Sequence, residues 1–200
     1  MTDRAGKHAD FGKRWGVVLA GGEGVRLRPL TRLICGDERP KQFCPLYGGL
    51  TLLEQARRRA ERSIRGNRVL FSLTRAHESF YRPILADCRR QWIVQPFNRG
   101  TGAAIVSSLA LIARRQPDAR AAIFPSDHHY SDENVVVEAV ENAFELAESE
   151  PHSVVLLGAR PTGPEVEYGW IELGDPIRGG ARAFRVRDFH EKPSRETAGL

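Results

Sequence analysis

The stretch WGVVLAGGEGVRLRPLT, residues 15–31, decides the fold of this chain. Residues 15–20 are nearly all apolar, which is typical of a parallel strand buried on both faces of a sheet. Glycines follow at once and let backbone N–H groups approach an anion without a Cβ in the way: Gly21, Gly22 and Gly24. Arg26 and Arg28 then add fixed positive charge. Because open α/β sheets bind ligands at the carboxyl ends of parallel strands, this pattern predicts a loop for the phosphates of a nucleoside triphosphate.

The glycines alone also fit a simpler interpretation. A pair of glycines after a strand often forms only a tight turn. Their spacing does not match the G-x-G-x-x-G pattern of dinucleotide-binding folds, and no G-K-[ST] closes the loop as in a P-loop. Phosphate binding and a plain turn therefore both stay open at this point.

The composition favours one globular domain with a modest positive charge. The chain has 200 residues, which is enough to bury a core. Its 30 Lys and Arg against 25 Asp and Glu give a net charge of +5, which suits anionic substrates, although a solvated surface explains most of the arginines equally well. No basic stripe with interleaved aromatic residues occurs, so nucleic acid is not a predicted partner.

The sequence predicts a protein of the cytoplasm. Its cysteines are scattered and odd in number, which favours a reducing compartment: Cys35, Cys44 and Cys88. No apolar run approaches the roughly 20 residues that span a bilayer, so no membrane association is predicted. Residues 1–14 are polar and charged, unlike a signal peptide, and are expected to form a disordered leader before one domain at residues 15–200.

Strand-like and helix-like segments alternate along the rest of the chain. We expect strands at residues 69–74, 91–95, 121–125 and 154–158, and two more at 169–173 and 183–189 without a long helix between them. We expect helices at residues 52–65, 77–88, 103–113 and 132–149. The pattern predicts an α/β fold, Rossmann-like and doubly wound, in which helices cover both faces of a mixed, mainly parallel sheet.

Details of the helices follow from their residues. Thr51 and Glu54 have the spacing of a capping box, and the helix after them carries its arginines opposite its apolar face. Pro83 is expected in the first turn of its helix. Residues 103–113 are apolar almost all round, which predicts a helix buried against the sheet.

Polar segments at the expected strand ends carry a resemblance to a known family. LAGGEGVRLRPLTR, RPKQF, FPSDHH and FHEKP occur in this order and together closely resemble the sugar-1-phosphate nucleotidylyltransferases. RPKQF and QPFNRGTG, residues 95–102, are most similar to the mannose-1-phosphate guanylyltransferase branch. The resemblance covers roughly residues 15–195. It implies the nucleotide-diphospho-sugar transferase fold, with GTP and mannose 1-phosphate as substrates and GDP-mannose and pyrophosphate as products.

The resemblance implies a nucleotide site in the first part of the chain. Residues that would contact the nucleotide are Leu19, Ala20, Gly21, Gly22, Gly24, Gln95 and Gly100. Arg26 would stabilise the departing pyrophosphate, and Lys41 would act as a point charge beside the phosphates. The alternative for Lys41 is an ordinary loop lysine, and the segment LICGDE makes its link to Arg26 longer than the family pattern.

The resemblance also implies Mg²⁺ as cofactor, with Asp127 as its ligand. A hard cation of this kind prefers carboxylate and phosphate oxygens. The competing interpretation is a zinc site formed by Asp127, His128 and His129. Adjacent side chains rarely converge on one metal, so we expect the two histidines to be packing or hydrogen-bonding groups.

The last segments would bind the sugar phosphate. By resemblance, Gly169 lets the sugar approach the backbone, Glu191 accepts hydrogen bonds from its hydroxyl groups and Lys192 binds its phosphate. The implied catalytic set is Arg26, Lys41, Asp127 and Lys192. Without the resemblance, E-K-P would be interpreted as a surface turn and Trp170 as a packed strand residue.

The end of the chain leaves further interpretations open. In the family a second metal-binding aspartate follows the lysine of E-K-P, so we expect this chain to be the N-terminal and central part of a catalytic domain, truncated at its C-terminus. A nucleotide-binding fragment without catalysis and a poorly folding remnant are the alternatives. Thymidylyl, adenylyl or uridylyl transfer to glucose 1-phosphate is the alternative reaction, and association into a homo-oligomer is left open.

Overall fold

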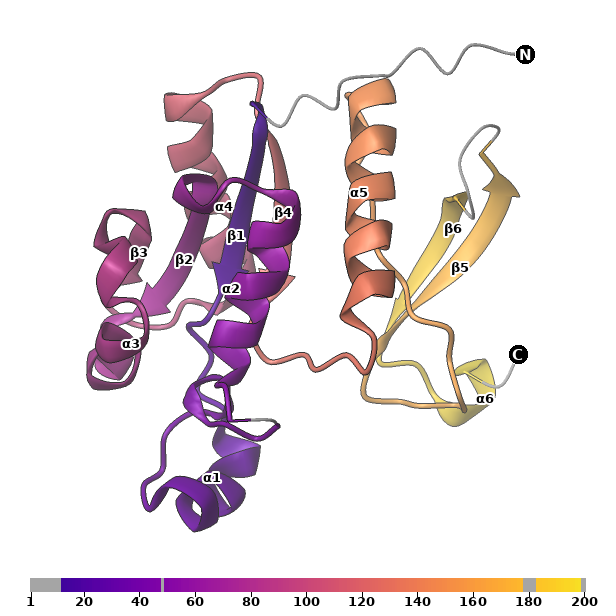
Figure 1. Ribbon diagram of the computed structural model, residues 1–200. Coiled ribbons are helices and arrows are strands. Elements are labelled where there is room, and N and C mark those ends of the chain that lie inside the picture. The colour runs from indigo at the N-terminus through magenta and orange to yellow at the C-terminus, as the bar shows by residue number, and fades with distance from the viewer. Residues whose placement is uncertain (1–11, 48, 178–182, 199–200) are drawn as a thin grey trace. The chain divides into compact units, whose positions relative to one another are not determined.

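The computed structural model describes residues 12–47, 49–177 and 183–198, and Figure 1 labels its helices and strands. These residues divide between Phe144 and Glu145 into two compact units, and each unit is described by itself. Of the expected leader, residues 1–11 lie outside the described residues, and Arg14 is already part of the first strand.

The first unit is built on a parallel sheet with the strand order β3-β2-β1-β4. Its strands are β1 (Arg14–Leu19), β2 (Val69–Thr74), β3 (Trp92–Gln95) and β4 (Arg120–Pro125). In the register of the sheet, Val18 lies between Phe71 of β2 and Phe124 of β4. Successive side chains of a strand point to opposite faces, so the fully buried Val17 and Val18 contribute to two different cores. The expected central strand and its neighbours are thereby confirmed.

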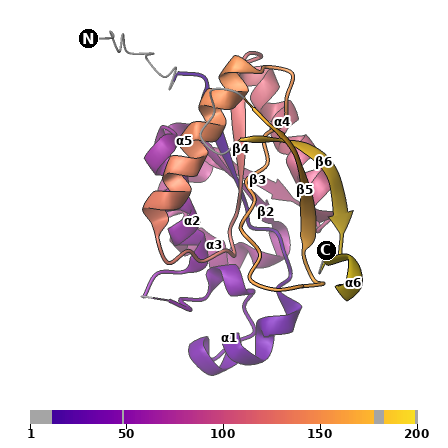
Figure 2. The ribbon, with the colours of Figure 1, turned by 90° about the vertical axis from the view of Figure 1, so that its right-hand side faces the viewer.

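Helices cover both faces of this sheet. They are α2 (Leu52–Ser63), α3 (Glu78–Ile84), α4 (Gly100–Arg115) and α5 (Glu133–Ser149), whereas α1 (Arg28–Cys35) contributes to neither core. Residues of α2, α3 and α5 share one core with Val18, whereas Ile112 of α4 packs with Val17 on the opposite face. Figure 2 shows α2 and α5 on one side of the strands and α4 on the other. The predicted α/β/α layering around a mainly parallel sheet is confirmed.

The two strands expected near the end of the chain form a sheet of their own in the second unit, whereas we expected them to extend one mixed sheet. β5 (Gly169–Pro176) and β6 (Phe184–Glu191) pair antiparallel, and the short helix α6 (Arg195–Ala198) follows. In the part of the chain that the structure describes, this two-stranded sheet is separate from the parallel one.

Three sequence expectations are wrong in detail. Residues 154–158 form no strand, and Val154 is 87% exposed, because an apolar run fixes no structure unless another strand pairs with it. The helix expected at 77–88 ends at Ile84, directly after Pro83, and a 3₁₀ segment, η5 (Ala86–Gln91), follows. Only one face of α4 is buried, through Ala104, Ser108 and Ile112.

Candidate functional site

The glycine loop follows β1 at the carboxyl edge of the parallel sheet. Gly24 has φ +59, and a Cβ there would lie 3.0 Å from the backbone nitrogen of Lys41. A Cβ on Gly21 would lie 2.9 Å from Oγ1 of Thr74, whose hydroxyl donates to the Gly21 carbonyl over 3.0 Å. At Gly22, by contrast, a Cβ would meet nothing within 4 Å. Two of the glycines are therefore required by close packing, and the third leaves open space above the backbone.

Gln42 holds the glycine loop through hydrogen bonds from its side-chain amide, a role that the sequence analysis missed. It lies in the 3₁₀ turn η2 (Lys41–Phe43) and is only 3% exposed. Its Nε2 donates to the carbonyl of Gly22 over 2.8 Å and to that of Ala20 over 3.3 Å. The RPKQF motif contained the signal, since a glutamine beside a candidate phosphate-binding lysine offers two N–H donors for backbone carbonyls.

The ends of β1 and β4 are joined directly. The carbonyl of Leu19 accepts hydrogen bonds from the backbone N–H of Ser126 over 3.2 Å and from its hydroxyl over 2.6 Å. Ala20 donates its N–H to the carbonyl of Ser72 on β2 over 2.9 Å. Leu19 and Ala20 thus anchor the glycine loop to both neighbouring strands.

Lys41 and Asp127 meet at this edge. The Nζ of Lys41 lies 2.8 Å from Oδ2 of Asp127, and both side chains are about one third exposed, at 31% and 34%. Because Gly24 packs against the backbone of Lys41, the structure brings the glycine loop, the lysine and the aspartate together. Arg26 lies in the turn η1 (Val25–Leu27), directly after Gly24, with an exposed side chain.

The link before Lys41 is held by local contacts. Arg39 donates from Nε and Nη2 to the two carboxylate oxygens of Asp37, each over 2.7 Å, and this hydrogen bonding lowers the pKa of Asp37. Cys44, which follows the motif, is buried with its Sγ 3.1 Å from that of Cys35. Burial, together with the contact to Cys35, raises the pKa of the Cys44 thiol to about 12.

Gln95 and Gly100, which were expected to contact the nucleotide, occupy different positions. Gln95, the last residue of β3, donates to Oγ of Ser72 over 3.1 Å, and its Nε2 would lie 4.0 Å from a Cβ on Gly21. Gly100 begins α4 with φ +84, and its N–H donates to Oδ1 of Asn98 over 2.8 Å. Gln95 therefore lies beside the glycine loop, and Gly100 is explained by a left-handed backbone conformation that favours glycine.

In the second unit the expected sugar-phosphate residues gather at one end of the two-stranded sheet. Gly169 of β5 pairs with Glu191 of β6, and a Cβ on Gly169 would lie 3.2 Å from Oε2 of Glu191. Lys192 has φ +45, its N–H donates to the carbonyl of Tyr168 over 3.2 Å, and its Nζ lies 3.9 Å from Glu167. A non-glycine residue with positive φ is strained, and such strain is concentrated at functional sites.

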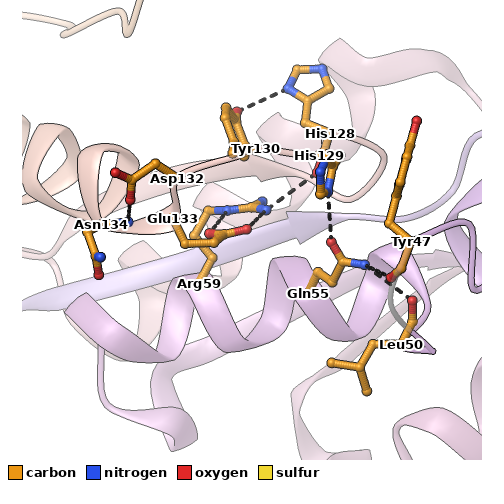
Figure 3. A network of polar contacts seen from close by, with 10 residues as sticks. All are labelled: Tyr47, Leu50, Gln55, Arg59, His128, His129, Tyr130, Asp132, Glu133 and Asn134. Atoms are coloured by element: carbon orange, nitrogen blue, oxygen red, sulfur yellow. Dashed lines mark hydrogen bonds and ion pairs between the residues drawn. The ribbon is translucent and has the colours of Figure 1, made fainter.

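The two histidines after Asp127 have contacts of their own. The ring of His129 stacks on Tyr47 with 4.2 Å between the centroids, and Nδ1 of His128 lies 3.3 Å from the hydroxyl of Tyr130 (Figure 3). Among the described residues, no group of three metal-ligating side chains includes Asp127. The expectation that the histidines pack and form hydrogen bonds agrees with this arrangement, and the zinc interpretation has no support from it.

Asp127 has the chemistry of a magnesium ligand. Mg²⁺ is usually held by one or two carboxylates together with substrate phosphates and water. The carboxylate of Asp127 is accessible, lies at the same edge as the glycine loop and contacts the side chains of Lys41 and His128. Its neighbour Lys41 is a flexible cation that can exchange partners, so the residues present fit this metal.

Comparison with known proteins agrees with the resemblance drawn from the motifs. The family description "Nucleotidyl transferase" matches residues 15–199. The mannose-1-phosphate guanylyltransferase ManC of Salmonella typhimurium is 36% identical over 198 residues, which cover 93% of this chain and 39% of that protein. The Escherichia coli K12 mannose-1-phosphate guanylyltransferase is 34% identical over 197 residues, with the same coverages of 93% and 39%. The chain thus spans about two fifths of the length of these curated relatives.

Solved structures show the same fold. The structure titled mannose-1-phosphate geranyltransferase from Thermus thermophilus matches with a TM-score of 0.80 and 38% identity, covering 93% of this chain and 52% of that one. Mannose-6-phosphate isomerase from Helicobacter pylori matches with a TM-score of 0.70 over 93% of this chain and 63% of that one, and at 21% identity it supports the fold alone. Among the described residues, no helix is long and apolar enough to cross a membrane.

Proposed function

We propose, because this chain belongs to the nucleotidyl transferase family, that it serves the transfer of a nucleoside monophosphate from a nucleoside triphosphate to a sugar 1-phosphate. The observation that supports the proposal most is the junction of Gly24, Lys41 and Asp127 at one edge of the sheet. It combines the backbone of a glycine loop, a partly exposed cation and a hard anionic ligand, which are the groups that a metal-bound triphosphate requires.

The reaction needs no protein nucleophile. A phosphate oxygen of the sugar 1-phosphate, already ionised at neutral pH, attacks the α-phosphorus of the triphosphate. The bond from the α-phosphorus to the bridging oxygen breaks, and pyrophosphate leaves with the bonding electrons. The protein has to align two anions that repel each other and to neutralise the charge that develops on the leaving group.

We assign these tasks to residues of the first unit. The backbone of the glycine loop would bind the triphosphate, most directly at Gly22, where the space above the backbone is open. Arg26 and Lys41 would neutralise charge on the departing pyrophosphate. Asp127 would hold Mg²⁺, which when bound adds positive charge to the phosphates.

We further propose GTP and mannose 1-phosphate as substrates. The support is that curated relatives named mannose-1-phosphate guanylyltransferase are 28–36% identical to this chain, together with the motifs RPKQF and QPFNRGTG. Gln95 and Gly100 would contact the base, and the side-chain amide of Gln95 offers both donor and acceptor atoms. Gly169 and Glu191 would contact the sugar, and Lys192 would bind its phosphate.

A substrate panel tests the proposal. The chain is incubated with Mg²⁺, one of GTP, dTTP, ATP or UTP, and either mannose 1-phosphate or glucose 1-phosphate, and release of pyrophosphate is measured. We expect the fastest release with GTP and mannose 1-phosphate. Replacing Asp127→Asn should lower turnover by about a hundredfold while thermal unfolding stays unchanged, because the metal ligand loses its charge.

The outcomes separate the parts of the proposal. If GTP is the poorest nucleotide but pyrophosphate is released with another, guanylyl specificity is refuted and nucleotidyl transfer stands. If GTP binds and no pair releases pyrophosphate, the chain binds nucleotides without catalysis, and the proposed transfer by this chain is refuted.

A further inference from the structure

Arg59 of α2 is a buried cation whose partners come from a distant part of the chain. Its side chain is 2% exposed, although the sequence pattern placed the arginines of this helix on the exposed face. Its Nε donates to Oε2 of Glu133 over 2.7 Å, and its Nη2 donates to Oε1 of the same carboxylate over 2.6 Å (Figure 3). This two-bond geometry is specific to arginine, because the planar guanidinium matches both oxygens of a carboxylate.

The same guanidinium also contacts the loop between β4 and α5. Its Nη2 lies 3.4 Å from the carbonyl of His128, and its Cζ lies 4.4 Å from the centre of the Tyr130 ring. Figure 3 shows Arg59 reaching from α2 to His128, Tyr130 and Glu133. One buried side chain therefore contacts the loop at His128 and Tyr130, and contacts the first residue of α5, Glu133.

The position of Asp127 makes this contact informative. The residue before it, Ser126, is fixed by two hydrogen bonds to the carbonyl of Leu19. The residue after it, His128, has its carbonyl within reach of Arg59. The backbone of Asp127 is thus held on both sides, although its own side chain is accessible.

A purely structural role explains the arrangement less well. A buried ion pair loses hydration, and apolar residues of similar volume often give equal or greater stability in its place. An apolar pair would hold α2 against α5, but it could neither donate to the carbonyl of His128 nor fix its direction. What the guanidinium provides beyond packing is the orientation of the loop.

We propose that Arg59 is a positioning residue that orients the loop at residues 127–132 so that the carboxylate of Asp127 faces the phosphate-binding edge. This inference rests on the proposed function of Asp127 as metal ligand. Partners that orient a metal ligand without touching the metal typically change metal affinity about tenfold or more when they are replaced. Arg59 would act in this way through the backbone on either side of the ligand.

The test compares Arg59→Lys with Arg62→Lys. Arg62 lies on the same helix and donates to Oδ1 of Asn134 over 2.8 Å, beyond the loop, so it is a matched control. GTP binding is measured by calorimetry with Mn²⁺ and with EDTA. We expect Arg59→Lys to reduce the gain in GTP affinity that Mn²⁺ provides by about tenfold, to leave binding in EDTA within about twofold, and to speed hydrogen exchange at residues 127–132. Arg62→Lys should resemble the parent chain in all three measurements.

A second variant keeps the test decisive if Arg59→Lys fails to fold. The double replacement Arg59→Met with Glu133→Leu removes both charges and keeps apolar volume. We expect this variant to remain folded and to lose the Mn²⁺-dependent gain. The proposal would be refuted if Mn²⁺ raised the GTP affinity of either folded variant as much as that of the parent chain. Loss of folding in both variants would also refute it. If the parent chain shows no Mn²⁺-dependent GTP binding, the proposed function fails instead, while hydrogen exchange at residues 127–132 still tests whether Arg59 orders the loop.

Discussion

The two places where this chain is expected to bind phosphate groups are built in different ways. The glycine loop of the first unit is surrounded by side chains that are almost fully buried, namely Gln42, Thr74 and Ser126. The turn at Lys192 lies at the end of a two-stranded sheet, and the described residues of the second unit include none that is buried. Tertiary packing fixes the first site, whereas strand register and a strained backbone fix the second.

This difference predicts which substitutions will change both stability and ligand binding, and which will change only one of them. In the glycine loop, a change at a buried contact should disturb both the stability of the unit and the binding of nucleotide, because the same hydrogen bonds serve both. At the Lys192 turn the two effects should separate, since few buried contacts depend on that turn. The following predictions test this contrast, from the largest expected effect to the smallest.

Gly24→Ala should have the largest effect. An alanine at φ +59 costs about 1–2 kcal/mol, and its Cβ would lie 3.0 Å from the backbone nitrogen of Lys41. We expect lower thermal stability and a loss of GTP affinity of more than about tenfold, because the loop must shift to relieve the contact. Gly22→Ala is the control, since its Cβ meets no atom within 4 Å and only nucleotide binding should suffer. Equal stability losses in both variants would contradict this account.

Gln42→Leu should destabilise the first unit by about 1–3 kcal/mol, because the buried carbonyl of Ala20 and the carbonyl of Gly22 lose a donor. Urea unfolding and GTP titration measure the two effects, and both should change together. The comparison variant in the second unit is Glu191→Gln, which should change stability by less than about 0.5 kcal/mol because the side chain is exposed. The contrast between the sites fails if Glu191→Gln is the more damaging of the two.

Lys192→Gly should raise the stability of the second unit by up to about 1 kcal/mol, since glycine adopts φ +45 without the steric cost of other residues. Hydrogen exchange of β5 and β6 should slow, while affinity for the sugar 1-phosphate falls with the loss of the cation. Lys192→Ala serves as control because it removes the charge and keeps the strain. A gain in protection from Lys192→Ala would show that relief of strain is not the cause.

The last prediction concerns an effect that is absent at neutral pH and appears only at alkaline pH. Burial raises the pKa of Cys44 from 9.0 to about 12, so the folded chain keeps a proton that the unfolded chain releases above pH 9. Stability from this source is complete below pH 9 and falls as the pH rises towards 12. Urea unfolding at a series of pH values should therefore show a smaller alkaline decline in Cys44→Ala. Parallel profiles for the two proteins would remove Cys44 from the explanation.

Local patterns predicted a large part of the fold. The capping box of α2 forms as expected, with Thr51 N–H donating to Glu54 over 2.8 Å and Glu54 N–H donating to Thr51 over 3.2 Å. The cap depends on neighbours in sequence alone. The strand expected at residues 69–74 agrees with β2, for which β1 and β3 supply the pairing partners. The strand expected at residues 154–158 failed because apolar character does not supply a pairing partner.

The site was predictable only in part for a related reason. Glycines at a strand end indicate a phosphate loop by residue type, so Gly24 could be selected from the pattern, whereas Lys41 and Asp127 were selected through the resemblance of their motifs. Arg59 could not, and for Gln42 the motif offered only a candidate donor, because their partners lie far away in the chain. An arginine on a helix looks like a solvated residue until the fold places Glu133 against it.

The contact between Lys41 and Asp127 has a consequence for the order in which a phosphate and a metal ion would bind. Opposite charges 2.8 Å apart largely cancel at longer distances, so this pair by itself attracts a free anion or a free divalent cation only weakly from a distance. A phosphate that bound alone would draw Lys41 away and leave the carboxylate of Asp127 without its partner. A cation that bound alone would leave the ammonium group of Lys41 without its partner. Under the proposed function, a complex of the two would let each side chain exchange one partner for another, so this ion pair would favour a metal and a phosphate that arrive together.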